Sequence, residues 1–179
     1  MSDSVVVTFA SRYGSTREVA EAMAATLRER GLEADARPMR EVRTLEGYGA
    51  IVLGTGLYMG HWYKDADRFL SQHRAALTGR PVAVFALGPI RSPLDEEERQ
   101  GSLAQLDERL AKFPWLEPIA REVFGGKYDP AKLRFPDNLI ASLPASPLKG
   151  MPASDVRDWR AIRAWATALA AKLRPTLTH

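Results

Sequence analysis

The sequence passes from a buried strand to a helix within residues 5–16, which read VVVTFASRYGST. Val5–Ala10 is a continuous apolar run rich in β-branched residues, which is typical of a strand buried on both faces of a parallel sheet. Small and polar residues then break the run at Ser11–Ser15, and Thr16–Arg30 follows with the apolar spacing of an amphipathic helix. The stretch therefore predicts the strand, loop and helix that open an α/β fold.

The same alternation of strands and helices continues along the rest of the chain. Further strands are predicted at Leu32–Pro38, Ala50–Leu53, Pro81–Leu87 and Pro118–Phe124, and further helices at Lys64–Ala76, Glu96–Lys112 and Ser154–Leu173. Strands that alternate with helices form right-handed βαβ units and hence a parallel sheet. We therefore expect a single domain over residues 1–179, with a doubly wound five-stranded parallel sheet in three layers, α/β/α, and a Pro-rich insertion at about 127–153.

Composition restricts the chemistry of such a domain. Of the 179 residues, 45% are hydrophobic and 26% charged, and 25 Lys and Arg against 22 Asp and Glu give a net charge of +3. This weak excess is no nucleic-acid signature, and the absence of cysteine excludes disulfides, thiolate metal sites and a cysteine nucleophile. No apolar run reaches the length of a membrane span, and the N-terminus, Met-Ser-Asp-Ser followed by a strand-like run, lacks the charged region and long apolar stretch of a signal peptide. We expect a cytoplasmic protein, with peripheral contact to the cytoplasmic face of a membrane left open.

Three strand ends carry residues suited to a ligand, because ligands of open parallel sheets bind beyond the carboxyl ends of the strands. In the first loop, Ser11–Thr16, hydroxyls and backbone N–H groups at a helix N-terminus are suited to cradle a phosphate, and Gly14 permits close approach. The pattern is neither a Walker A motif nor Gly-x-Gly-x-x-Gly. The alternative is an ordinary capping box, with Ser15 as the N-cap and Glu18 closing it.

The other two loops add aromatic side chains and further glycines. The loop Thr55–Tyr63 places three aromatic residues among glycines, an arrangement suited to a flat conjugated ligand. The third loop is Leu87–Arg91, which should meet the other two at the same edge of the sheet. The alternative for Trp62 and Tyr63 is that both simply anchor the following helix to the core.

The order of these motifs resembles the flavodoxin-like fold. The chain contains a strand, Ser-x-x-Gly-x-Thr, a helix, and then Gly-Thr-Gly followed by Tyr-x-Gly-His-Trp. Within this fold, the chain is similar over nearly its whole length to the flavodoxin-type, menaquinone-dependent protoporphyrinogen IX dehydrogenases. The matching stretches are Phe9–Glu18, Gly56–Phe69, Phe124–Asp129 and Asp158–Trp159.

This resemblance implies the strand order 2-1-3-4-5 and an FMN cofactor. The phosphate would lie at Ser11, Gly14, Ser15 and Thr16, and the ring between the loops around Tyr58–His61 and Gly88–Arg91. The cofactor-binding residues are then Ser11, Arg12, Tyr13, Gly14, Ser15, Thr16, Thr55, Gly56, Leu57, Tyr58, Met59, Gly60, Leu87, Gly88, Pro89, Ile90 and Arg91. The resemblance further implies a porphyrinogen substrate, a quinone acceptor and a place in heme biosynthesis.

Two side chains are catalytic candidates, although flavin chemistry needs no protein nucleophile. Arg12 lies in the first loop, where a guanidinium can pair the phosphate, stabilise reduced flavin or hold substrate carboxylates; the alternative is a solvated surface arginine. The same alternatives apply to Arg91. His61 is a candidate proton donor, with a structural role as the alternative. Asp95–Glu98 is interpreted as the acidic start of a helix rather than a metal site, so no metal is predicted.

The insertion departs from the family, because Phe135–Leu143 can form only about two helical turns before Pro144. The apolar residues of Phe135–Leu148 would form an interfacial anchor at a membrane, a cover over the last strand or a contact in a homodimer. Three other functions stay open: a flavodoxin-type electron carrier, a flavin-dependent quinone reductase without porphyrinogen activity, and a flavin-free binding module. The net charge of +3 disfavours the carrier, since such carriers are usually strongly acidic.

Overall fold

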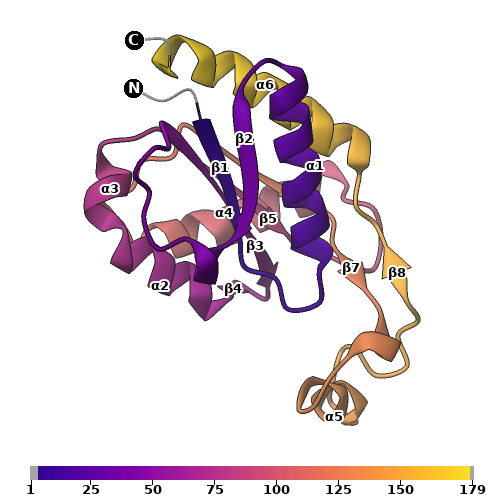
Figure 1. Ribbon diagram of the computed structural model, residues 1–179. Coiled ribbons are helices and arrows are strands. Elements are labelled where there is room, and N and C mark those ends of the chain that lie inside the picture. The colour runs from indigo at the N-terminus through magenta and orange to yellow at the C-terminus, as the bar shows by residue number, and fades with distance from the viewer. Residues whose placement is uncertain (1–3, 178–179) are drawn as a thin grey trace.

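The computed structural model describes residues 4–177 (Figure 1). Residues 1–3 and 178–179 lie outside this range, so the start of the N-terminus that lacks the features of a signal peptide is outside the described residues. The strands are β1 (Ser4–Phe9), β2 (Glu33–Pro38), β3 (Ala50–Tyr58), β4 (His61–Trp62), β5 (Val82–Leu87), β6 (Ala120–Phe124), β7 (Lys127–Tyr128) and β8 (Ser154–Asp155). The helices are α1 (Ser15–Glu29), α2 (Lys64–Gln72), α3 (Arg74–Thr78), α4 (Glu96–Leu110), α5 (Asp137–Ser142) and α6 (Trp159–Leu177), with 3₁₀ turns η1 (Met39–Glu41) and η2 (Pro130–Lys132).

Five parallel strands form the central sheet in the order β2-β1-β3-β5-β6. This is the predicted order 2-1-3-4-5, because β4 is only a two-residue strand that pairs antiparallel with the end of β3. The flavodoxin-like α/β fold expected from the sequence is therefore confirmed. The strand β2, which is short and mixed in polarity, lies at an edge of the sheet.

Helices cover both faces of the sheet, with α1 and α6 on one face and α2, α3 and α4 on the other (Figure 1). Alternate residues of β1 point to opposite cores: Val5 and Val7 pack with α1 and α6, whereas Val6 packs with the helices of the other face. All three side chains are fully buried. A run of consecutive apolar residues is therefore what this position in the sheet requires.

Two predicted helices have different bounds in the structure. The helix expected over Lys64–Ala76 is divided into α2 and α3 at His73, whose backbone has φ −105° and ψ 14°. The Nε2 atom of His73 lies 3.2 Å from the carbonyl oxygen of Val42, a contact that holds the ring at this break. The last helix begins at Trp159 rather than Ser154, because residues 154–155 pair with β7 as a strand.

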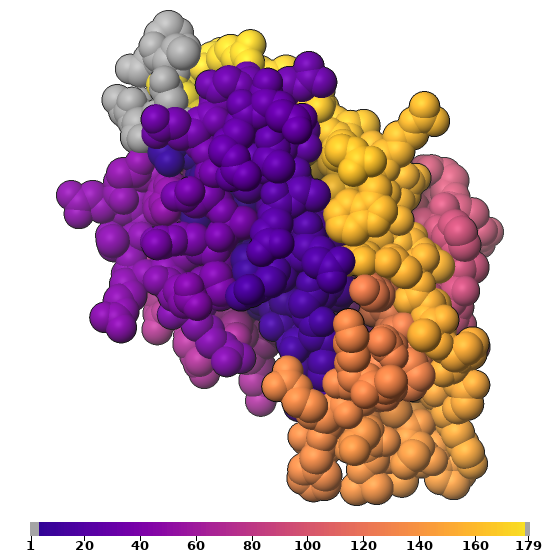
Figure 2. Space-filling view, turned by 45° about the vertical axis from the view of Figure 1, so that its right-hand side comes forward, coloured from indigo at the N-terminus to yellow at the C-terminus, as the bar shows by residue number. Residues whose placement is uncertain are grey.

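The insertion leaves the sheet through β7 and returns through β8. Between them, α5 stands beyond the main body of the molecule, below the β1–α1 loop (Figure 1). Figure 2 shows that the insertion protrudes at the lower edge of the molecule. Its exposed large apolar side chains are Phe135, Leu139, Ile140 and Leu143. None of the helices within residues 4–177 combines the length and hydropathy that a membrane crossing requires.

Gly54 should tolerate no side chain, because the ring of Phe85 lies against it. The two residues are neighbours in the β3–β5 pair, and a Cβ at Gly54 would lie 2.1 Å from Cζ of the fully buried Phe85. We expect Gly54→Ala to lower the free energy of unfolding by about 1–3 kcal/mol, measured by urea denaturation. Gly79→Ala is the control, since its Cβ position is open and its φ is −97°. Equal losses in the two variants would contradict the packing argument.

Candidate functional site

The carboxyl ends of β1, β3 and β5 surround a cavity of about 450 Å³, which we call the sheet-edge cavity. Nine of the predicted cofactor-binding residues line it: Ser15, Thr16, Gly56, Leu57, Tyr58, Met59, Leu87, Gly88 and Ile90. The catalytic candidate His61 also lines it, as do four residues that were not predicted as cofactor ligands, Trp62, Tyr63, Gly126 and Lys127. The segment predicted as a loop, Thr55–Tyr63, is the end of β3 and the β3–β4 hairpin, because β3 continues to Tyr58 instead of ending at Leu53. This hairpin, the β1–α1 loop and the end of β5 meet at one edge of the sheet.

The first turn of α1 brings unpaired backbone N–H groups to this cavity. Gly14 is the N-cap residue and is left-handed at φ 89°, and its amide donates to Oγ of Ser11 at 2.9 Å. The amides of Ser15 and Thr16 have no acceptor among residues 4–177, as is usual in a first helical turn, and the hydroxyl of the buried Thr16 has no partner there either. Together with the helix dipole, these donors suit a phosphate or another anion.

The capping-box interpretation of this turn is wrong, because Glu18 does not bond back to the N-cap residue. Its carboxylate instead pairs with Arg157, Oε2 to Nη1 at 2.9 Å, and lies 3.9 Å from Nζ of Lys127. Arg157 also donates twice to Asp155, at 2.9 and 2.7 Å, and once to the carbonyl oxygen of Ser15 at 3.2 Å. This guanidinium, on a side chain only 2% exposed, therefore pairs with two carboxylates and holds the first turn of α1.

The β3–β4 hairpin supplies the aromatic wall of the cavity. Tyr58 pairs with His61 across a turn at Met59–Gly60, where both residues have positive φ. Tyr58 and His61 are exposed, whereas the buried Trp62 donates from Nε1 to Asp67 of α2 at 2.7 Å. Trp62 therefore anchors the following helix, as the alternative interpretation has it, and also borders the cavity.

The opposite wall comes from the end of β5 and the start of the insertion. A Cβ at Gly126 would lie 2.8 Å from the carbonyl oxygen of Gly88, so this position has no room for a side chain, and a Cβ at Gly88 would lie 3.1 Å from the side chain of Val123, which leaves little room there. Lys127 follows and brings a cation to the cavity, close to the first turn of α1. Nothing local in the sequence marks Lys127 as a ligand; the one signal was its place in Phe124–Asp129, a stretch that resembles the family.

The other predicted cofactor ligands lie outside the lining of this cavity; they are Ser11, Arg12, Tyr13, Gly14, Thr55, Gly60, Pro89 and Arg91. Tyr13 donates from its hydroxyl to Asp137 in α5, and Arg12 pairs with the same carboxylate, Nε to Oδ2 at 3.1 Å. Burial and the bond to Asp137 raise the pKa of Tyr13, so its phenol remains a donor at neutral pH. Arg91 donates to the carbonyl oxygen of Pro147. The insertion thus engages three of the side chains that were expected at the cofactor.

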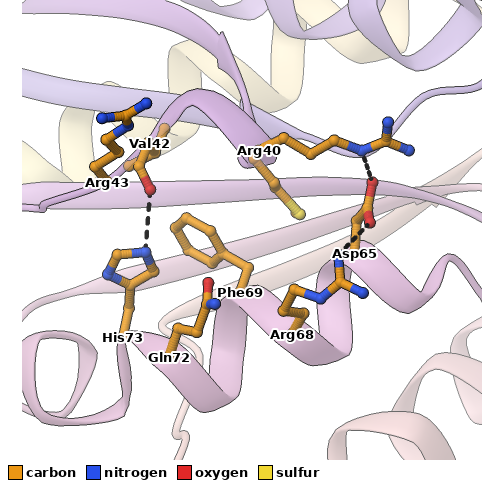
Figure 3. Close-up of a pocket in the computed structure, with 9 residues that line it drawn as sticks. Arg40, Val42, Arg43, Asp65, Arg68, Phe69, Gln72 and His73 are labelled. Atoms are coloured by element: carbon orange, nitrogen blue, oxygen red, sulfur yellow. Dashed lines mark hydrogen bonds and ion pairs between the residues drawn. The ribbon is translucent and has the colours of Figure 1, made fainter.

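Two further hollows lie outside the sheet-edge cavity. The first, of about 600 Å³, is lined by Ser11, Arg12, Arg40, Tyr63, Lys64, Asp65, Arg134 and Phe135, and we call it the arginine hollow. The second, of about 540 Å³, lies over η1 and α2 (Figure 3). Within residues 4–177, no group of three His, Asp or Glu side chains is arranged to hold a metal ion.

Comparison with known proteins identifies the family. A family model described as a flavodoxin domain matches residues 6–154. The chain belongs to the flavodoxin domain family. Protoporphyrinogen IX dehydrogenase (quinone) of Escherichia coli K12 is 26% identical to this flavodoxin domain over 141 residues, which cover 77% of this chain and 76% of that protein. NAD(P)H dehydrogenase (quinone) of Methylocella silvestris is 32% identical over 108 residues, which cover 45% of this chain and 54% of that protein.

Solved flavodoxin structures share the fold. A flavodoxin from the domain Archaea superposes with a TM-score of 0.56 at 12% identity, over 96% of this chain and 99% of the other. Rubredoxin oxygen:oxidoreductase from Desulfovibrio gigas gives a TM-score of 0.61 at 14% identity, over 99% of this chain and 38% of the other. These likenesses concern the fold alone. Family and curated relatives together make this flavodoxin domain a flavodoxin-like oxidoreductase, for which a flavin is the implied cofactor.

Arg157→Met should weaken the fold more than the loss of an exposed ion pair does. The Arg157 side chain is 2% exposed and holds two carboxylates, so we expect a loss of about 2–4 kcal/mol in the free energy of unfolding. Arg121→Met is the control: it removes a pair with Asp107 whose side chains are 42% and 46% exposed, and it should cost less than about 1 kcal/mol. Urea denaturation at neutral pH measures both losses, and similar values would show that burial of Arg157 has no energetic effect.

The stability that Asp155 contributes should depend on pH. Hydrogen bonds from Arg157 lower the pKa of Asp155 below its ordinary value of 3.8. A carboxyl with a depressed pKa stabilises the fold above its unfolded pKa, and this contribution is lost as the pH falls through the folded pKa. The stability difference between wild type and Asp155→Asn should therefore be constant from about pH 7 to 5 and shrink below about pH 4. Thermal unfolding across this range measures the difference, which would be independent of pH if Asp155 were unpaired.

Proposed function

We propose that the sheet-edge cavity binds FMN and that the protein is a quinone-linked protoporphyrinogen IX dehydrogenase of heme biosynthesis. The FMN proposal is carried by the first turn of α1, whose unpaired amides and Thr16 hydroxyl border the cavity. The substrate and the acceptor are proposed from the Escherichia coli relative, whose name contains both.

The residues of the cavity fit a flavin phosphate and a flat ring system. Ser15 and Thr16 supply donors, and Lys127 adds a positive charge near the same helical turn. The remaining lining is largely apolar or aromatic, with Leu57 and Tyr58 among its side chains. Gly88 and Gly126 form part of the opposite wall, where backbone rather than a side chain borders the cavity.

Bound FMN supplies the redox chemistry, since it takes up hydrogen from a donor and passes electrons to an acceptor. The chain itself holds the phosphate at α1 and excludes water with apolar side chains such as Leu87 and Ile90. His61 extends from β4 to the cavity, and imidazole is the side-chain type that gives and takes up protons near neutral pH. An imidazole nitrogen of His61 is therefore the proposed place where the proton that accompanies substrate oxidation is held.

A flavin-dependent quinone reductase is the second candidate, because the relative from Methylocella silvestris carries that activity in its name. Anaerobic assays of FMN-loaded protein with menadione distinguish the two functions. Oxidation of protoporphyrinogen IX supports our proposal, whereas oxidation of NADH without porphyrinogen turnover supports the quinone reductase. Protein that takes up no FMN, shown by its absorption spectrum after desalting, would refute both.

Thr16→Val should weaken FMN binding by roughly 10- to 100-fold, because a hydrogen bond to a charged phosphate contributes about 1.5–3 kcal/mol. Riboflavin lacks the phosphate and should bind the variant and the wild type equally well. Thr26→Val is the matched control, since this buried threonine lies on the same helix but donates its hydroxyl to the carbonyl oxygen of Ala22. Quenching of flavin fluorescence gives the dissociation constants. Equal losses for FMN and riboflavin would remove Thr16 from the phosphate site.

A further inference from the structure

We propose that the arginine hollow binds two carboxylates of the substrate, which is accordingly an apolar organic dicarboxylate. The inference rests on the proposed function, because the hollow adjoins the cavity to which we assign FMN, and Tyr63 lines both. It extends that function by giving residues outside the flavin cavity the task of recognising the acidic groups of the substrate.

Positive charge exceeds negative charge around the arginine hollow. Its four cations are Arg12, Arg40, Lys64 and Arg134. Arg12 pairs with Asp137 at 3.1 Å, and Arg40 pairs with Asp65 at 2.5 Å. Lys64 and Arg134 have no carboxylate partner within residues 4–177, so two positive charges remain for a ligand. Two carboxylates on one molecule would complete the charge balance, and a guanidinium binds a carboxylate through two parallel hydrogen bonds.

Two aromatic side chains add apolar surface to the hollow. Tyr63 and Phe135 line it and are 37% and 76% exposed. Burial raises the pKa of Tyr63, so its phenol is neutral at physiological pH. A Cβ at Gly56 would lie 3.1 Å from Cε2 of Tyr63, and both residues line the sheet-edge cavity. An apolar body held against Tyr63 would therefore lie beside the flavin cavity while its carboxylates reach the cations.

The insertion completes this hollow. Arg12 comes from the β1–α1 loop, Arg40 from η1 and Lys64 from the start of α2, whereas Arg134 precedes α5. Arg134 donates from Nη2 to the carbonyl oxygen of Arg12 at 2.9 Å, and its Cζ lies 5.6 Å from the ring centroid of Tyr13. Figure 1 shows α5 close to the β1–α1 loop from which Arg12 and Tyr13 extend. The insertion thus adds Arg134, which has no carboxylate partner in the described part of the chain, to the three cations that the rest of the fold supplies to the hollow.

The neighbouring hollow in Figure 3 lacks the features that favour a substrate. Asp65 lies between Arg40 and Arg68 and pairs with both. Phe69 is 2% exposed, and none of the lining residues is shared with the sheet-edge cavity. Arg43 lies at the opposite end of this hollow from Asp65, which makes it a matched control for a surface cation that contacts no substrate.

The test compares protoporphyrinogen IX with its dimethyl ester, which keeps the apolar ring and removes both negative charges. FMN-loaded protein oxidises each form anaerobically with menadione in the same nonionic detergent. We expect the wild type to have a KM roughly tenfold lower for the diacid. The double variant Lys64→Gln, Arg134→Gln should raise the KM of the diacid roughly tenfold and leave kcat, the KM of the ester and FMN retention within about twofold. Arg43→Gln should match the wild type.

Equal KM values for the diacid and the ester in the wild type would overturn the inference, as would an unchanged KM for the diacid in the double variant. If the double variant loses FMN, Lys64→Gln alone replaces it, since the Lys64 side chain makes no hydrogen bond or ion pair within residues 4–177. If neither porphyrinogen is oxidised although FMN is bound, the proposed function fails. Fluorescence titration with protoporphyrin IX and its dimethyl ester then tests the hollow separately, and equal affinities would overturn the inference as well.

Discussion

The guanidinium of Arg157 joins parts of the chain that lie far apart in the sequence. It binds Asp155 just after the insertion, Glu18 in the first turn of α1 and the carbonyl oxygen of Ser15, and it lies over the ring of Trp159 at the start of α6. Without this cation, only Lys127, at 3.9 Å, would offset the negative charge of Glu18 in the helical turn that the proposed phosphate site needs, and the carboxylate would repel the phosphate more strongly. The docking of the insertion and the electrostatic character of the ligand site therefore depend on one side chain.

Tyr63 separates two compartments of different chemistry. The sheet-edge cavity is largely apolar and receives the unpaired amides of α1, whereas the arginine hollow is lined by four cations. This division places recognition of acidic groups outside the cavity to which we assign the redox chemistry. A substrate can then be selected by its charges in the arginine hollow while its reacting part lies among the apolar side chains of the sheet-edge cavity.

The local sequence pattern was enough to predict the central strands, whose composition is set by their own burial. Val5–Ala10 and Pro81–Leu87 became β1 and β5, because strands buried on both faces must be apolar throughout. Elements that depend on distant partners could not be predicted: residues 154–155 form a strand because β7 lies beside them. The same holds for the candidate site, since the side chain of Tyr13 is directed by Asp137, 124 residues further along the chain.

The close contact between Gly54 and Phe85 explains why the first residue of the Gly-Thr-Gly motif is a glycine. Gly54 resembles part of a flexible binding loop, yet it lies within β3, faces the Phe85 ring and lines no part of the sheet-edge cavity. The core requires glycine here, because any side chain would collide with the Phe85 ring. A larger residue at this position needs a smaller one than Phe85 opposite it, so this glycine reports on the packing of the core and not on the residues that line the pocket.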